Sequence, residues 1–221
     1  MKKIFGILAL GLVYAGFLWA VCPGCRANIP QENAIIKPKS EMKTLIVYFS
    51  YTAGNTKRIA EKVQKAIGGD LVSLEPVKPY SDDYEKVVKQ GREEVEGGYK
   101  PELKSLGVDL QNYDRIIVGT PTWWYRMAPV VLSFLSGNDF RGKVVVPFMT
   151  NAGWPGSVIT DMVSLAEGNG AKVEHAHAFK FSSDEKHFDR MVTPVEELEQ
   201  WIDDLKSVSY THLRAHETGA Y

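Results

Sequence analysis

Apolar runs alternate with amphipathic segments five times between residues 44 and 205. The first run, residues 44–50, is rich in β-branched and aromatic side chains, which is typical of a strand buried on both faces of a parallel sheet. Strands are predicted at residues 44–50, 71–74, 113–119, 143–149 and 172–179, and helices at residues 57–67, 81–96, 129–135, 156–167 and 194–205. The alternation predicts an α/β fold, a doubly wound five-stranded parallel sheet with helices on both faces.

Charge and cysteine content exclude several classes of protein. The 221 residues carry 26 Lys and Arg against 27 Asp and Glu, which gives a net charge of −1. A chain this close to neutral has no global field to hold a polyanion, so we expect no nucleic-acid partner. Two cysteines are too few for a disulfide-dense scaffold or a four-cysteine zinc site. No triad spacing and no paired carboxylates support a hydrolase.

The N-terminus has the pattern of an export signal. Two lysines precede an uncharged run, residues 4–21, and a polar stretch follows. We expect residues 1–27 to form an export signal or a membrane anchor, and residues 28–43 to form a linker. The expected location is therefore outside the cytoplasm of a bacterium, periplasmic or anchored to the membrane, with membrane contact through this segment.

Three fates of the N-terminal segment stay open. It is cleaved after Ala27, or lipidated at Cys22 or Cys25, or retained as an anchor. The two cysteines have the spacing of a thiol redox motif. A redox pair needs a helix N-terminus inside a folded domain to lower the thiol pKa, so the end of a signal is the favoured interpretation.

The C-terminal residues 207–221 show neither helical nor strand periodicity, and they resemble translated adapter read-through. We expect a tail outside the domain, which then spans residues 44–206. His212 and His216 have the spacing of a metal pair on a helix. The segment has no apolar face and contains Gly219, so no metal site is predicted.

The chemistry of an open α/β sheet concentrates where parallel strands end. Ligands bind there, in the crevice beside the reversal of strand order. The segments to inspect therefore follow the first, third and fourth predicted strands.

The first loop, residues 50–56, is rich in hydroxyl groups. Ser50, Thr52 and Thr56 can donate to phosphate oxygens, Gly54 allows close backbone approach, and the helix start offers free N–H groups. The loop is neither a P-loop nor a G-x-G-x-x-G dinucleotide motif. A polar turn with a helix cap is the alternative.

The second loop, residues 119–129, contains the adjacent aromatic residues Trp123, Trp124 and Tyr125. A core helix spaces its aromatic residues by three or four, so adjacent rings at this edge are suited to stacking on a flat ligand. A hydrophobic lid over the sheet edge, or a partner contact, is the alternative.

The third loop, residues 150–156, combines small residues with glycines that let backbone amides approach a planar ligand. Trp154 is predicted as a second wall. A glycine-rich turn without a ligand is the alternative.

Residues 47–56, 117–125 and 148–154 together carry a resemblance. In this order and spacing they resemble the flavodoxin family, and the resemblance extends over residues 43–205. It implies a flavodoxin-like sheet of strand order 2-1-3-4-5 and a bound FMN.

The resemblance also implies which residues contact FMN. The phosphate would be held by Ser50, Thr52, Gly54, Asn55 and Thr56. The isoalloxazine would be flanked by Pro121, Thr122, Trp123, Trp124 and Tyr125, and by Thr150, Asn151, Ala152 and Gly153. The loop contains one residue more than the family pattern Thr-Gly-Asn-Thr. The extra residue, Ala53, is therefore included among the candidate FMN contacts. It leaves open which of two neighbouring positions in the loop makes each phosphate contact.

The flavin would supply the redox chemistry, and the protein would fix the position of the flavin and its electrostatic environment. Because the chain is nearly neutral, its charge does little to lower the reduction potential of the flavin. Residues 122–125 also lack the glycine whose peptide flips beside flavin N5 in the family. We therefore expect weak stabilisation of the one-electron-reduced flavin, which favours NAD(P)H-dependent quinone or flavin-type reductase activity.

Expected partners are a redox protein or a small-molecule acceptor such as a quinone, with NAD(P)H as a candidate donor. No catalytic acid or base is identified. Tyr125 and Arg126 are candidates to donate to a flavin oxygen or an acceptor, whereas His175 and His177 are interpreted as structural. The alternative function is a non-catalytic binding module that keeps the fold without flavin.

Overall fold

The computed structural model describes residues 42–184 and 186–215, with side chains described up to residue 206. Contacts divide the chain into two units, Met1–Lys39 and Ser40–Tyr221, and the described residues belong to the second. The strands are β1 (Thr44–Tyr48), β2 (Asp70–Ser73), β3 (Arg115–Trp123), β4 (Arg126–Met127), β5 (Val144–Asn151), β6 (Lys172–Val173) and β7 (His177–Lys180). The helices are α1 (Asn55–Ile67), α2 (Tyr84–Glu96), the 3-10 turn η1 (Leu110–Asn112), α3 (Pro129–Gly137), α4 (Val158–Gly168) and α5 (Val195–Ala215).

The sheet has the order β2-β1-β3-β5-β6, and each neighbouring pair is parallel. β7 also pairs in parallel with β5, beyond β6, so β6 and β7 together make the fifth strand. The predicted α/β fold and strand order 2-1-3-4-5 are thereby confirmed, because the predicted fourth strand is β5. The fifth strand is interrupted near His175, whose φ of 48° lies outside the extended region.

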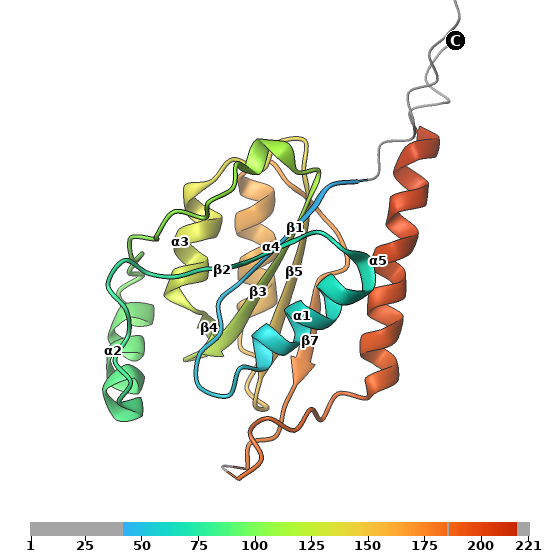
Figure 1. Cartoon of the computed structure of the whole chain (residues 1–221). Helices are drawn as coiled ribbons and strands as arrows, with labels where there is room; N and C mark the ends of the chain where they lie inside the picture. Colours follow the sequence, from blue (N-terminus) through green and yellow to red (C-terminus); the bar gives the residue numbers. More distant parts are fainter. Residues whose placement is uncertain (1–41, 185, 216–221) are drawn as a thin grey trace, which may run out of the picture. The chain divides into compact units, whose positions relative to one another are not determined.

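Helices cover both faces of the sheet (Figure 1). α1 and α5 pack on one face around Val63 and Trp201, and α3 and α4 pack on the other around Phe134. Successive residues of β1 belong alternately to the two layers, and each is buried. Complete burial of an apolar side chain of this size stabilises a fold by about 1.5–3 kcal/mol, so the double-faced burial of β1 accounts for its unbroken apolar run.

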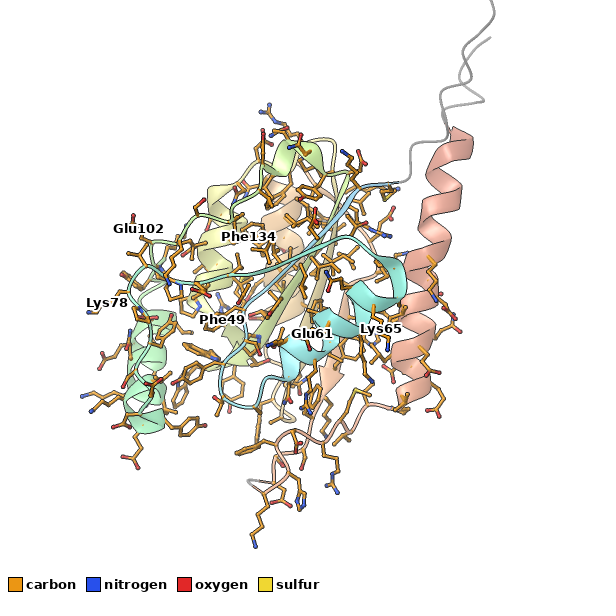
Figure 2. All side chains as sticks on the ribbon, viewed as in Figure 1. Phe49, Glu61, Lys65, Lys78, Glu102 and Phe134 are labelled. Atoms are coloured by element: carbon orange, nitrogen blue, oxygen red, sulfur yellow. The ribbon has the colours of Figure 1, made fainter. Side chains whose placement is uncertain are left out.

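α2 belongs to an excursion of the chain, residues 78–101, that is closed at its base by backbone pairing. Val77 N donates to Glu102 O at 2.8 Å, and Lys104 N donates to Glu75 O at 2.8 Å. Figure 2 labels Lys78 and Glu102 at this base. In Figure 1 α2 stands beyond the edge of the sheet rather than over its centre.

The start of α2 differs from the prediction. The predicted helix starts at Ser81, whereas Asp83 caps the observed helix and accepts from the backbone N–H groups of Glu85 and Lys86. Serine and aspartate are both favoured at a helix N-cap, so the residue types do not decide between Ser81 and Asp83. Of this helix, Val87 and Gly91 are buried.

β3 is longer than predicted and ends in a tight hairpin. It runs to Trp123 and pairs antiparallel with β4, with Trp123 opposite Arg126. The two turn residues, Trp124 and Tyr125, have φ values of 48° and 65°. Such turns are usually made by Asn and Gly, so these bulky residues carried no local signal for a hairpin.

The end of the domain also differs from the prediction. The backbone of α5 stays helical to Ala215, where a tail without helical periodicity was expected from residue 207. The sequence has no glycine or proline between Val195 and Gly219, so no helix-breaking residue ends α5 at residue 207. The expectations for residues 1–27, for most of 28–43 and for His216 fall outside the described residues. Within residues 42–184 and 186–215, no helix has both the length and the hydropathy needed to cross a bilayer.

Candidate cofactor site

A cavity of about 350 Å³ opens at the carboxyl ends of β1, β3 and β5. This volume lies within the ordinary range for a small-molecule site. It is lined by Ser50, Tyr51, Thr52, Ala53, Asn55, Thr56, Tyr84, Val87, Val88, Gly91, Pro121, Thr122, Trp123, Trp124, Thr150, Asn151, Ala152, Ser182 and Phe188. The three loops singled out by the sequence therefore converge on one cavity.

The first loop reaches α1 through two residues in the left-handed region. Thr52 has φ 44° and Gly54 has φ 69°, and Gly54 N donates to Tyr51 O at 3.2 Å. This turn accommodates the extra residue Ala53, which lines the cavity. Gly54 itself precedes α1 at the N-cap position, and no side chain caps the helix there. The first N–H groups of α1 thus lack the side-chain acceptor that usually satisfies them.

Ser50 contributes an unpaired hydroxyl to the cavity. Its Oγ is buried and has no hydrogen-bond partner among the described residues. A buried polar atom without a partner is costly, so its presence in a cavity wall indicates a ligand with an acceptor group. The uncapped helix start and this donor lie in the same loop and favour an anion.

Thr56 joins the first loop to the third. Its Oγ1 lies 2.8 Å from Thr150 Oγ1, and both residues are buried. The Thr56 hydroxyl, which was predicted to donate to the phosphate, is therefore engaged with Thr150 in this structure. The hydrogen bond also fixes the distance between the two loops.

A fourth segment, residues 181–184 and 186–190, completes the polar end of the cavity and was not predicted. Asn55 Nδ2 donates to Phe188 O at 2.9 Å, and Arg58 donates to Asp189 O at 2.7 Å and to Asn55 Oδ1. Phe188 and Ser182 line the cavity. The one available signal was a lone Phe within a polar, charged loop.

Trp123 lies within an aromatic cluster made with Phe49, Tyr51 and Tyr80. Its ring centroid is 5.0 Å from that of Tyr80, 5.6 Å from Phe49 and 6.0 Å from Tyr51, all in edge-to-face geometry. The indole lines the cavity and is also part of the packing that supports it. Edge-to-face pairs of this kind are worth about 0.5–1.5 kcal/mol each beyond burial.

Trp124 lies at the mouth of the cavity and is 41% exposed. Its Nε1 donates to Val88 O at 3.0 Å, and the Arg92 guanidinium lies 5.2 Å from its ring centroid. Tyr125 is 55% exposed and does not line the cavity. Its carbonyl instead accepts from Ser157 N at 3.0 Å.

The third loop supplies Thr150, Asn151 and Ala152 to the cavity. Asn151 Oδ1 accepts from Gly153 N at 2.8 Å, so Gly153 supports the loop from outside the lining. The prediction that Trp154 forms a second wall is wrong, because this residue is 58% exposed and lies outside the lining. Its loop turns outward after Gly153, whose φ is 107°.

The second wall is α2, which the sequence did not indicate. Tyr84, Val87, Val88 and Gly91 line the cavity from this helix. The Tyr51 hydroxyl donates to Ser81 O just before it. Burial raises the pKa of Tyr51, and the carboxylates of Asp82 and Asp83 raise it further, so this phenol stays a donor.

The described residues that line the cavity carry no formal charge. His177 packs instead between β7 and α5, with its ring centroid 4.5 Å from Phe179 and its Nε2 3.0 Å from Glu197 Oε1. Arg126 is engaged at the start of α4, where it contacts Ser157 Oγ at 3.1 Å and Asp161 Oδ2 at 3.3 Å. Neither side chain is placed to act on a ligand in the cavity.

Comparison with known proteins agrees with this geometry. Residues 43–170, more than half of the chain, match the family model described as Flavodoxin. The chain belongs to the flavodoxin family. A curated flavodoxin, Flavodoxin 1 of Salmonella typhimurium, is 27% identical over 106 residues, which cover 46% of each protein. The chain thus spans about half the length of the curated flavodoxins it matches.

Solved structures extend the likeness over the domain. A candidate flavoprotein from Bacteroides uniformis is 27% identical, with a TM-score of 0.60, and the match covers 74% of this chain and 99% of that one. A flavoprotein from Lactobacillus acidophilus, solved in complex with FMN, is 26% identical with a TM-score of 0.53, and the match covers 62% of this chain and 92% of that one. FMN is the cofactor that the flavodoxin family binds.

The cavity of this flavodoxin-family chain fits FMN on two observations of its own. The orphan donor of Ser50 and the uncapped start of α1 suit a phosphate, and the aromatic and apolar wall suits a flat ring. All the individual contacts with FMN stay predictions, and three of the candidate residues, Gly54, Tyr125 and Gly153, lie beside the lining rather than in it.

Proposed function

We propose that the chain binds FMN in the cavity and transfers electrons through it. The observation that carries the proposal is the buried, unpartnered hydroxyl of Ser50 beside the uncapped start of α1, within a cavity of about 350 Å³. FMN supplies the one- and two-electron redox chemistry, and the protein supplies its binding and environment.

Different side chains would bind the phosphate and the ring of FMN. Ser50, Thr52 and Asn55 would hold the phosphate together with the backbone N–H groups of the first turn of α1. Thr122, Trp124 and Ala152 would flank the ring. The apolar surface of α2 would exclude water from one side, and this exclusion strengthens the hydrogen bonds that remain.

Among the residues that the structure describes, no charged side chain lines the cavity, and this supports a role in electron transfer without a protein acid or base at the ring. As the finer proposal, we propose reductase activity with NAD(P)H as donor and a quinone or a flavin as acceptor. The near-neutral chain and the glycine-free hairpin support it, as does the exposure of Trp124 and Tyr125 where an acceptor would approach. A redox protein is the alternative acceptor.

We also propose that the protein acts outside the cytoplasm, exported or held at the membrane through residues 1–27. The lysine pair and the uncharged run of the N-terminus support this location.

Purification of the full chain tests the central proposal. The purified protein should be yellow, and its flavin-free form should bind FMN with quenching of flavin fluorescence. A colourless protein that does not bind added FMN would overturn the proposal in favour of a binding module without flavin. For the protein loaded with FMN, NAD(P)H oxidation with a soluble quinone separates a reductase from a pure electron carrier.

A further inference from the structure

Gly91 is an interior residue of α2, and it is buried. Glycine is among the least favourable residues inside a helix, because it adds backbone entropy to the unfolded chain and no packing to the folded one. Helix formation therefore gives no reason for a glycine at this position, and a tertiary contact must require it.

The contact is the indole of Trp123. A Cβ atom at Gly91 would lie 2.9 Å from Trp123 Cε3 and 3.2 Å from Cζ3, closer than carbon atoms pack. Phe49, Tyr51 and Tyr80 contact the indole at ring-centroid distances of 5.0–6.0 Å and oppose its displacement, and its open side is the one that lines the cavity. Figure 2 labels Phe49 of this cluster.

The same stretch of α2 holds the neighbouring indole. Val88 O accepts from Trp124 Nε1, and the Arg92 guanidinium lies over the Trp124 ring. Residues 88, 91 and 92 share one face of a helix, so a single helix face fixes both adjacent tryptophans of the hairpin.

We propose that Gly91 is a positioning residue of the FMN site. Because Gly91 has no side chain, the α2 backbone can pack closely against Trp123. This contact holds the aromatic wall, which consists of Trp123 and Trp124, in its binding position before the cofactor enters. The inference rests on the proposed function, since it assumes that the cavity binds FMN. A wall that is already in place avoids the entropy that ordering it on binding would cost.

The test is the full-length Gly91→Ala variant, with Gly137→Ala as the matched control. Gly137 ends α3, and a Cβ there meets nothing within 4 Å. We expect Gly91→Ala to weaken FMN binding about tenfold or more and to change the near-ultraviolet circular dichroism of the tryptophans in the flavin-free protein. Gly137→Ala should change neither.

A second background separates positioning from general damage. Trp123→Leu removes the ring atoms that Gly91 approaches, so the Gly91→Ala effect on FMN binding should fall below about twofold in that background. If Gly91→Ala does not fold but the double variant does, the contact is supported as well. Unchanged FMN binding in Gly91→Ala, or an equal loss in both backgrounds, overturns the inference. So does failure of both variants to fold.

The inference and the proposed function fail in different ways. If the wild-type protein does not bind FMN, the proposed function fails, and the positioning of FMN by Gly91 fails with it. If the wild type binds FMN and Gly91→Ala binds it equally well, the inference alone is overturned.

Discussion

Thr56 Oγ1 and Thr150 Oγ1 lie 2.8 Å apart in a buried contact between the first turn of α1 and the end of β5. The first and third of the loops that line the cavity are thus joined by a side-chain hydrogen bond.

Substitution of one member of this pair should be costly. Thr150→Val keeps the volume but leaves the Thr56 hydroxyl buried without a partner, so the free energy of unfolding should fall by about 1–3 kcal/mol. Urea denaturation measures this, with exposed Thr160→Val on α4 as the control. The double variant with Thr56→Val should cost less than the sum of the single changes. Strict additivity would contradict the contact.

Ser50→Ala should separate ligand binding from stability. The Ser50 hydroxyl has no protein partner, so its removal should leave the melting temperature of the flavin-free protein unchanged or raised. FMN affinity should fall about ten- to a hundredfold, the loss of one hydrogen bond to a charged acceptor. Riboflavin, which lacks the phosphate, serves as the control ligand and should bind both proteins equally. An equal loss for the two ligands would place Ser50 away from the phosphate.

Gly156→Ala should displace the Trp124–Tyr125 hairpin. Gly156 has φ 57°, and a Cβ there would lie 1.9 Å from Tyr125 O. The backbone must therefore move, at a cost of about 2 kcal/mol or more. Gly142→Ala is the matched control. Gly142 also has a positive φ, 74°, but a Cβ there meets nothing within 4 Å, so its variant has the backbone strain without the steric clash. Proteolysis at Arg126 should become faster in Gly156→Ala only, and equal rates in the two variants would exclude the contact.

Tyr113 should make the stability of the domain fall at alkaline pH. Its hydroxyl donates to Asp70 Oδ2 at 2.6 Å, and this bond, with burial, raises the pKa of Tyr113 to about 12. The pKa of an unfolded tyrosine is about 10, so the unfolded chain loses its proton first as the pH rises. The contribution is therefore fully present below pH 10 and declines as the pH rises from 10 toward 12.

Tyr113→Phe should remove that dependence. Urea midpoints at neutral pH and near pH 11 should differ more in the wild type than in the variant, after other alkaline effects common to both are subtracted. At neutral pH the variant should lose about 1 kcal/mol with the hydrogen bond. Parallel pH profiles for the two proteins would show that Tyr113 titrates at its ordinary pKa.

The sheet and the three loops could be predicted because their signals are local. The unbroken apolar run of β1 follows from burial on both faces, and parallel strands must end at one edge, which brings the first, second and third loops together. Ser50 and Thr52 were therefore identified from their place after a strand. Trp154 shares that place but turns away, because loop direction depends on backbone angles that sequence spacing does not reveal.

Sequence alone determined the α/β architecture, the strand order implied by the family, and the edge at which a ligand would bind. Tertiary structure alone decided what closes the cavity. The α2 wall with Gly91, the segment around Phe188 and the bond between Thr56 and Thr150 join residues far apart in the chain. Periodicity reports which face of an element is buried, whereas these contacts depend on where separate elements meet, and that is settled only when the whole core packs.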